Sequence, residues 1–420
     1  MKLFKKTVSL LLAGAMAAGL LAGCSGSSTS SGSGSSSDTQ SAAQTEESAS
    51  GEAHKIAVIF NAMGSSELQM KDYLENYVGP AYNTEFMFSE IIKDSGAAVT
   101  FIEQARAAGC EGILNFNSDT QEQATATANE AGMYVLTQTN KIPDSIKDMP
   151  YNLGSLGSSV DETVAAYSDM VESVLADGQP HNVIIVSGGS AQGNIQHNET
   201  TIAILNILQE TYGLTYDKSV EELAASDVQT VVETGTDIKI AIYPGFAGTD
   251  TYVTGFSSLL QTGDYDTVMA TYAIYSQLMQ PISEVEKALG TDIKMVSIAD
   301  ISDSTKTAFE EGMLDGAVVT PCCMQVGAMF SVMYNALEGN AQAIQQDGKA
   351  SQFMMLKWPC ANAEEYTTIE QLDITPETYA LKTENIDQLL VSKNPEMNYE
   401  NFNAYIESLT AEQVAQNSGL

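Results

Sequence analysis

The chain has 420 residues, of which 18 are Lys or Arg and 54 are Asp or Glu, so its formal charge at pH 7 is −36. This imbalance disfavours nucleic acid as a partner, because affinity for a phosphate backbone comes largely from Lys and Arg. Hydrophobic residues make up 44% of the chain and charged residues 17%, which excludes a protein that is disordered throughout.

The first residues have the pattern of a secretory signal, with Lys residues before the apolar run 8–22. The quartet Leu-Ala-Gly-Cys that ends at Cys24 resembles the lipobox of bacterial lipoproteins, in which the Cys thiol takes a lipid and becomes the mature N-terminus. We therefore expect a lipoprotein signal peptide over 1–23, a lipid anchor on Cys24, and a place on the bacterial cell membrane facing outside the cytoplasm. An uncleaved anchor helix and an ordinary signal are the alternatives.

Residues 24–54 are rich in Ser and Gly and almost devoid of large apolar groups. Such a segment cannot offset the entropy of ordering, so we predict a disordered tether. Random-coil scaling gives it a reach on the order of 30 Å.

From Lys55 onward, short apolar runs rich in β-branched residues alternate with segments of helical period. The predicted strands are Ile56–Phe60, Gly112–Asn117, Met133–Thr137, Asn182–Val186, Ile238–Tyr243, Thr267–Thr271, Lys294–Ile298 and Gly316–Thr320. The predicted helices include Ser159–Leu175, Thr305–Glu311 and Val326–Leu337, and Ser159 with Glu162 has the spacing of a capping box. This alternation indicates parallel sheets covered on both faces. We predict an α/β fold with two doubly wound Rossmann-like lobes, which begin at Lys55 and near Ser158.

Beyond residue 350 the pattern is weaker. Residues 353–358 and 379–382 read as strands, and residues 384–390 read as a short helix. Residues 394–420 carry an apolar stripe at helical spacing, so we predict a C-terminal helical extension that docks on the body.

Open α/β sheets bind ligands at the carboxyl ends of their strands. The residues just after the apolar runs are amides, hydroxyls, aromatics and few charges. A turn or a helix cap explains each of them singly, but as a group they indicate a polar cleft with an aromatic floor. They include Asn61, Gln138, Thr139, Phe246, Tyr272, Asp300 and Thr320.

In order and spacing, the chain over 55–340 resembles the type I solute-binding proteins of ABC importers, in the branch of the ribose- and galactose-binding proteins. The resemblance rests on four stretches: IAVIFNAMGSS, GCEGILNFNSD, NVIIVSGGSAQGN and IKMVSIADISDSTKTAFEEGMLDGAVVT. It implies two lobes joined by a three-strand hinge, a ligand captured between them by hinge closure, and delivery to a membrane permease. The implied lobes are 55–157 plus 322–350, and 158–321 plus 351–393.

The same resemblance assigns roles to positions of this sequence. Phe246 stands where sugar-binding members place a ring that stacks on the sugar, and Asp300 stands where they place a carboxylate that accepts from two hydroxyls. Several other positions depart from the family. Tyr272 replaces an Asn, Thr320 replaces a Gln, Gln138 and Thr139 replace an Asp-Arg pair, and His197 with Asn198 occupies the region that supplies an Arg.

The only Arg of the chain is Arg106, in a segment that we expect to pack on the outside of the first sheet. Bidentate binding of carboxylate or phosphate is normally the work of Arg, although a helix N-terminus can substitute. The sequence therefore favours a neutral ligand rich in hydroxyl groups, most of all a sugar, and leaves nucleosides and other solutes open.

Enzymatic motifs are incomplete. The run Gly188–Gly193 fits neither a nucleophile elbow nor a dinucleotide loop, and the sequence contains three His. No cofactor or metal motif is present, so we expect neither a cofactor nor a metal, and no enzymatic activity. The adjacent Cys322 and Cys323 allow two thiols, a strained disulfide or part of a metal site.

The sequence thus predicts a lipid-anchored solute-binding protein whose partners are a small sugar-like ligand and an ABC permease. A binding module for a sensor kinase or chemoreceptor is an alternative. A surface hydrolase is a third, which the missing motifs disfavour.

Overall fold

The structure is a computed structural model that describes residues 52–192, 195–246 and 250–420. The predicted signal peptide, the lipid-anchor residue Cys24 and nearly all of the predicted tether lie outside these residues. Within them, no helix combines the length and the apolar character that crossing a membrane requires.

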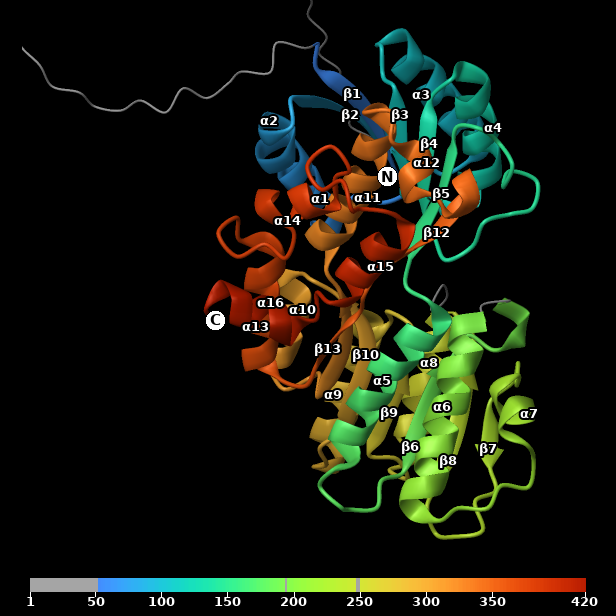
Figure 1. Ribbon diagram of the computed structural model, residues 1–420. Helices are drawn as coiled ribbons and strands as arrows, with labels where there is room; N and C mark the ends of the chain where they lie inside the picture. Colours follow the sequence, from blue (N-terminus) through green and yellow to red (C-terminus); the bar gives the residue numbers. More distant parts are fainter. Residues whose placement is uncertain (1–51, 193–194, 247–249) are drawn as a thin grey trace, which may run out of the picture. The chain divides into compact units, whose positions relative to one another are not determined.

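The first sheet has six parallel strands in the order β12-β5-β4-β3-β1-β2 (Figure 1). They are β1 (His54–Phe60), β2 (Thr84–Ile91), β3 (Gly112–Asn115), β4 (Tyr134–Gln138), β5 (Asn152–Gly157) and β12 (Ser351–Met354). The central strands β1, β3 and β4 are almost entirely buried. Burial on both faces explains their continuous apolar runs.

Helices cover both faces of this sheet. They are α1 (Ser65–Asp72), which continues through a π-helical turn (Tyr73–Val78) into α2 (Gly79–Ala81), and α3 (Ser95–Ala107), α4 (Gln121–Ala131), α11 (Cys322–Leu337) and α12 (Ala341–Ile344). A 3₁₀ turn (Ser118–Thr120) precedes α4. Side chains of α3 and α4 pack on one face in a cluster with Ile59, Ile113 and Val135. Side chains of α1 and α11 pack on the other face, with Val58 and Leu114.

The second sheet has seven strands in the order β13-β11-β10-β9-β6-β8-β7, and its edge strands β13 and β7 are antiparallel to their neighbours. They are β6 (Val183–Ser187), β7 (Thr230–Val232), β8 (Ile240–Pro244), β9 (Thr267–Ala270), β10 (Lys294–Asp300), β11 (Gly316–Thr320) and β13 (Trp358–Cys360). Each predicted strand between 182 and 320 is present, within two residues at either end.

Helices also cover both faces of the second sheet. They are α5 (Val160–Leu175), α6 (Ile195–Tyr212), α7 (Val220–Ala224), α8 (Asp250–Leu260), α9 (Tyr275–Leu289), α10 (Asp303–Glu310) and α13 (Ala363–Ile374), with a 3₁₀ turn at Ser190–Gln192 before α6; a further 3₁₀ turn at Gln346–Gly348 precedes β12 of the first sheet. Side chains of α5 and α6 pack with Ile185 and Ile242 on one face. Phe256 of α8 and Leu278 of α9 belong to the cluster on the other face. The predicted two doubly wound lobes are therefore confirmed.

The chain passes between the two sheets at three places. It goes from β5 to α5 at 157–160, from β11 to α11 at 320–322, and from β12 to β13 at 355–357. This confirms the predicted three-strand hinge.

One segment pairs differently from the expectation. The sequence placed residues 351–393 in the second lobe, but β12 pairs in parallel with β5 of the first sheet. Gly154 makes this pairing possible. Its φ is +116°, and a Cβ there would lie 2.0 Å from the Ser351 carbonyl oxygen, so any other side chain would push β12 away. Residues 379–382, which read as a strand, form a turn.

The predicted C-terminal extension folds as α15 (Tyr399–Glu407) and α16 (Ala411–Ser418), after α14 (Thr383–Leu389). Its Phe402 is buried and meets Phe353 of β12 edge to face at 5.4 Å between ring centroids. The indole N–H of Trp358 donates to the Leu409 carbonyl at 2.9 Å. The extension therefore docks at the third crossing between the sheets.

The N-terminus of α5 differs in detail from the predicted capping box. The Ser159 hydroxyl accepts from the Glu162 N–H at 3.0 Å. The Glu162 carboxylate does not complete the box, and its Oε2 is buried without a hydrogen-bond partner among the described residues. Burial is the main cause that raises the pKa of Glu162 to about 7, and the nearby Glu407 adds to the rise.

Candidate functional site

A cavity of about 550 Å³ lies where carboxyl ends of strands from both sheets meet. Asn61 follows β1, Gln138 ends β4, Asp300 ends β10 and Thr320 ends β11, and all four border it. Parallel strands bring residues that are far apart in sequence to one edge, which is why strand-end residues meet here. The rest of its lining is Gly64, Ser65, Ser66, Glu67, Met70, Phe116, Ala273, Tyr275, Ser276, Gln277, Ser302, Ser304, Cys322, Gln325 and Lys357.

Asp300 and Lys357 carry opposite charges at this cavity. Asp300 touches solvent in the cavity, but protein surrounds it on its other sides, and this burial raises the pKa of its carboxyl above the usual value. The Lys357 ammonium opposes that rise, while Glu67 adds to it. Burial lowers the pKa of Lys357, against the effect of Asp300. Each group is therefore held in surroundings that disfavour its charge.

The Lys357 ammonium donates a hydrogen bond to the Thr320 hydroxyl. Among the residues that the structure describes, Lys357 forms no ion pair with a carboxylate, Asp300 included. The two charges thus face one cavity without direct contact between them. Sequence reasoning missed Lys357 because it comes from a crossing between the sheets and not from a strand end. A single charge inside the apolar run of residues 353–359 was the signal that marked it.

Three predicted aromatic residues form a separate stack. Phe246 and Tyr272 lie parallel with ring centroids 4.9 Å apart, and His197 stacks on Tyr272 at 5.1 Å. Phe246 is 54% exposed, whereas His197 is 5% exposed and burial lowers the pKa of its imidazole to about 4. His197 is therefore neutral at pH 7. None of the three borders the cavity as the structure describes it, so their place in a binding site stays a prediction.

The hydroxyl of Tyr272 is engaged within the protein, because it donates to the Gly245 carbonyl at 2.7 Å and lies 3.1 Å from the Tyr252 hydroxyl. Only the exposed ring of Phe246 is turned to solvent in this stack. The stack can therefore offer an apolar ring face more readily than a polar group.

Two further predicted residues also lie away from the cavity lining. Thr139 uses its backbone, with its N–H donating to Leu156 and its carbonyl accepting from the Gln352 amide. Asn198 lies on α6, and its Oδ1 is buried without a hydrogen-bond partner among the described residues. Ligand contact by either remains a prediction.

The glycine turn after β6 has a structural explanation. The Asp227 carboxylate accepts from the Ser190 hydroxyl and from the Ala191 N–H, both at 2.7 Å. These bonds hold the turn and lower the pKa of Asp227. Gly189 has φ +70°, and a Cβ there would lie 2.8 Å from Asp227. The Ser190 hydroxyl thus helps to hold this turn in place.

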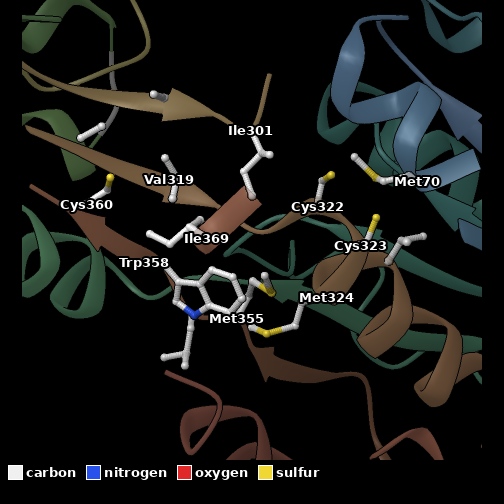
Figure 2. Packing of buried hydrophobic residues seen from close by; sticks show 14 of the residues in the cluster. Met70, Ile301, Val319, Cys322, Cys323, Met324, Met355, Trp358, Cys360 and Ile369 are labelled. Atoms are coloured by element: carbon white, nitrogen blue, oxygen red, sulfur yellow. The ribbon is translucent and has the colours of Figure 1, made fainter. Parts of the chain in front are cut away.

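The sulfur atoms of Cys322 and Cys323 and a carboxylate oxygen of Asp373 lie within 4.8 Å of one another, and all three residues are buried. The Asp373 oxygens accept the backbone N–H groups of Cys322, Cys323 and Met324 at 2.7–3.2 Å. Both cysteines are free thiols, and they lie in the same packed cluster as Met70 and Ile301 (Figure 2). Asp373 thereby caps α11. Its carboxylate oxygens already accept three N–H groups, so little of their capacity remains for binding a metal ion.

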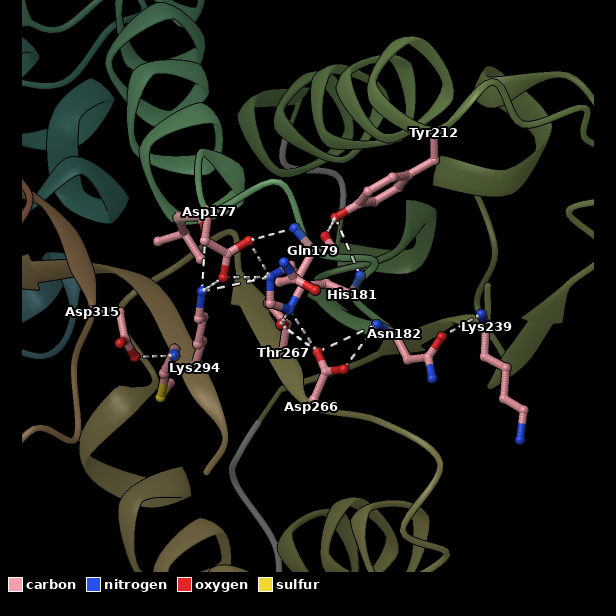
Figure 3. A network of polar contacts seen from close by, with 12 residues as sticks. Asp177, Gln179, His181, Asn182, Tyr212, Lys239, Asp266, Thr267, Lys294 and Asp315 are labelled. Carbon is pink, nitrogen blue, oxygen red and sulfur yellow. Dashed lines mark hydrogen bonds and ion pairs between the residues drawn. The ribbon is translucent and has the colours of Figure 1, made fainter. Parts of the chain in front are cut away.

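A polar cluster lies at the opposite ends of the second sheet's strands (Figure 3). His181 contacts Asp266 at 3.0 Å and Asp177 at 3.1 Å, and Lys294 contacts Asp177 at 2.6 Å. The Tyr212 hydroxyl accepts from the His181 N–H and donates to a backbone carbonyl. These residues join the amino ends of β6, β9 and β10, so they stabilise the sheet rather than contribute to the cavity.

A larger cavity, of about 840 Å³, lies outside the strand ends, between α5, β13, α13 and α16. Trp358 and Leu356 are among its apolar residues, and Glu162 and Asp169 are among its acids. Lys357 is the one described residue that borders both this cavity and the cavity at the strand ends. Its position among helices does not correspond to the strand-end crevice of α/β folds.

No protein-family model and no curated protein matches this sequence. Solved structures do match. A myo-inositol-bound ABC transporter solute-binding protein from Bacillus halodurans is 16% identical with a TM-score of 0.52, and the match covers 76% of this chain and 99% of that one. A D-allose-bound protein of the same description from Actinobacillus succinogenes is 10% identical with a TM-score of 0.54, covering 75% and 99%.

A periplasmic sugar-binding protein from Pseudomonas fluorescens is 10% identical with a TM-score of 0.58, and the match covers 86% of this chain and 99% of that one. These likenesses establish the fold. The chain has the type I periplasmic-binding-protein fold, as its two sheets and three crossings indicate.

Proposed function

We propose that the protein is a solute-binding protein that captures a neutral, hydroxyl-rich small molecule, most of all a sugar, and delivers it to an ABC permease. The observation that carries this proposal is the cavity of about 550 Å³ at the strand ends, which amides, hydroxyls and one Asp–Lys pair border. Such groups suit hydroxyls, each of which donates one hydrogen bond and accepts others.

The similar solved proteins support this ligand class. Their descriptions name myo-inositol, D-allose and, for a protein from Burkholderia graminis with a TM-score of 0.52, D-arabinose. All three are uncharged polyols. The described cavity agrees with that class, because its lining contains no Arg and its acids Glu67 and Asp300 outnumber its one Lys. That balance disfavours anions.

In the proposed mechanism, side chains from both sheets bind the ligand. Asp300 accepts from ligand hydroxyls, while the amides of Asn61 and Gln138 both donate and accept. Movement at the three crossings closes the sheets around the ligand and removes these hydrogen bonds from water. Phe246 is the ring that would cover a C–H face on closure, because it is the exposed member of the aromatic stack.

The anchor is the other part of the proposal. A lipid on Cys24 and the tether over 24–54 would keep the folded part near a membrane permease. Metabolic labelling of expressing cells with a radioactive fatty acid tests this. Label should enter the wild type and not the Cys24→Ser variant, and equal labelling of both would contradict the anchor.

A thermal-shift screen tests the ligand. Residues 51–420 form one compact unit, so that segment is screened against sugars, inositols, nucleosides, amino acids and peptides. A ligand that binds only the folded state adds RT ln(1 + [L]/Kd), about 2.7 kcal/mol at a hundredfold excess over Kd. A rise in Tm with polyols is the expected result. A rise with nucleosides or amino acids alone would overturn the sugar assignment.

A further inference from the structure

Lys357 occupies an unusual place for a charged residue. It lies on the short crossing 355–357 between β12 of the first sheet and β13 of the second. Its neighbours Met355, Leu356 and Trp358 are buried, and Trp358 lies in the packed cluster of Figure 2. An ammonium in such a place has lost most of its hydration, which costs free energy unless something polar compensates.

The protein itself compensates Lys357 only in part. Its described hydrogen bond goes to the neutral Thr320 hydroxyl, although an ammonium has three donors. Asp300 faces the same cavity, but the two groups form no ion pair. Two opposite charges at one cavity that are not in contact gain little from their attraction, so the desolvation cost of Lys357 is offset only in part.

We infer that Lys357 is a ligand-binding and specificity-determining residue that acts together with Asp300 on two adjacent hydroxyls of the ligand. The ammonium donates to the oxygen of one hydroxyl, and the Asp300 carboxylate accepts the hydrogen of its neighbour. The ligand thereby connects the two charges, which form no ion pair with each other. This inference rests on the proposed function, since it specifies how the same cavity recognises a polyol.

A contact between Lys357 and the ligand also bears on how the two sheets close. A strand-end residue moves with one sheet, whereas Lys357 lies on the crossing that joins both. Its hydrogen-bond partner, Thr320, is the first residue of another crossing, 320–322. A ligand held by Lys357 therefore contacts the part of the chain that must bend when the sheets close.

The test measures binding by titration calorimetry on residues 51–420, with myo-inositol, D-allose and D-arabinose as probes. Lys357→Met removes the ammonium and keeps the aliphatic stem, and we expect about a 10- to 100-fold loss of affinity, in the range of a hydrogen bond to a charged group. Lys357→Arg, which retains a charged donor, should keep more of the affinity than Lys357→Met. Lys349→Met is the control, because Lys349 is exposed and is not part of the cavity lining.

Two further measurements separate ligand contact from support of the fold. Asp300→Asn combined with Lys357→Met should lose less affinity than the sum of the single losses, because both residues bind one hydroxyl pair. The loss of affinity that Lys357→Met causes should be smaller for a deoxy analogue that lacks one of those hydroxyls than for the parent sugar. A merely structural lysine would weaken all ligands alike.

The outcomes are distinguishable. A wild-type protein that binds none of the polyols overturns the proposed function, and this inference with it. A wild type that binds a polyol with the same affinity as Lys357→Met overturns the inference alone. A variant that loses affinity equally for the sugar and its deoxy analogue also overturns it, since the loss would then not depend on adjacent hydroxyls.

Discussion

The carboxylate of Asp300 is the single group whose removal should weaken ligand binding most clearly. It borders the cavity from the end of β10, where burial already disfavours its charge. We expect Asp300→Asn to reduce binding of the polyol found in the screen by about 1.5–3 kcal/mol, the range for a hydrogen bond to a charged group. Titration calorimetry measures it. Asp303→Asn, three residues on and outside the cavity lining, is the matched control, and equal losses in both would remove Asp300 from the site.

His197 supplies a prediction for pH. Burial lowers the pKa of its imidazole to about 4 in the folded protein, compared with a usual value of 6.5. The unfolded chain therefore takes up the proton first as the pH falls, so stability is fully present above about pH 6.5 and is lost between about 6.5 and 4. We expect His197→Phe to abolish this pH-dependent contribution to the free energy of unfolding, which is on the order of 1–2 kcal/mol between pH 7 and pH 5.

Urea unfolding at both pH values measures that difference. Because carboxylates also titrate in this range, the informative quantity is the pH dependence of the wild type minus that of the variant. Identical dependence in the two proteins would mean that His197 is protonated as easily when folded as when unfolded.

Strand-end residues were predictable, and residues from other places were not. Asn61, Gln138, Asp300 and Thr320 meet at one cavity because the carboxyl ends of parallel strands share an edge. Phe246 and Tyr272 of the aromatic stack also follow strands, but they border no part of that cavity. The sequence does not reveal how far apart two strand ends lie along the edge, so it could not separate these residues from the others. Lys357 could not be placed without knowing that the chain crosses between sheets there.

At the scale of elements, α11 depends on one side chain that is distant in sequence. The Asp373 carboxylate accepts three N–H groups at the start of this helix, which is almost entirely buried. We expect Asp373→Ala to cost about 2–4 kcal/mol, because loss of a cap costs about 1 kcal/mol and buried unpaired donors cost more. Asp373→Asn keeps one acceptor and should cost less.

Urea unfolding monitored by far-UV circular dichroism gives both values. Asn362→Ala is the comparison, because Asn362 caps the more exposed helix α13 with two N–H bonds. A loss at Asp373 no larger than that at Asn362 would show that burial of the α11 end does not add to the cost.

The elements themselves differed in how well their pattern identified them. Runs such as Gly316–Thr320 are apolar, β-branched and buried on both faces, and the predicted and observed bounds coincide. β5 was missed because its sequence NLGSLG contains two glycines, although every residue in it is buried. One of them, Gly154, is needed for the approach of β12, so close packing overrode β propensity there. β2 was missed because much of it is exposed at the sheet edge.

At the scale of the whole described protein, the two sheets share one hydrophobic cluster. It includes Val58 of β1 and Leu136 of β4 from the first sheet, and Val186 of β6 and Val319 of β11 from the second. α11 and the buried Trp358 lie in the same cluster. Such a shared core couples the stability of the two halves.

We therefore expect residues 51–420 to unfold in urea in one transition. The fluorescence of Trp358, the only Trp in the chain, reports the crossing, and far-UV circular dichroism reports all helices and strands. The two curves should coincide, with the same midpoint and the same slope. Separate midpoints would mean that one lobe unfolds while the other stays folded.

The lining of the cavity comes mostly from residues beyond strand ends, from helix starts and from one crossing, and four of its members also belong to the packed core: Met70, Phe116, Tyr275 and Cys322. Substitutions at the other lining residues leave the packed core intact, whereas a Cβ at Gly154 would collide with the Ser351 backbone of β12. The residues that determine the fold and those that contact the ligand are thus mostly different ones in this protein. This chain keeps the fold of solved proteins to which it is only 10–16% identical, and exchanging a few lining residues outside the core is the change that alters recognition with the least cost to that fold.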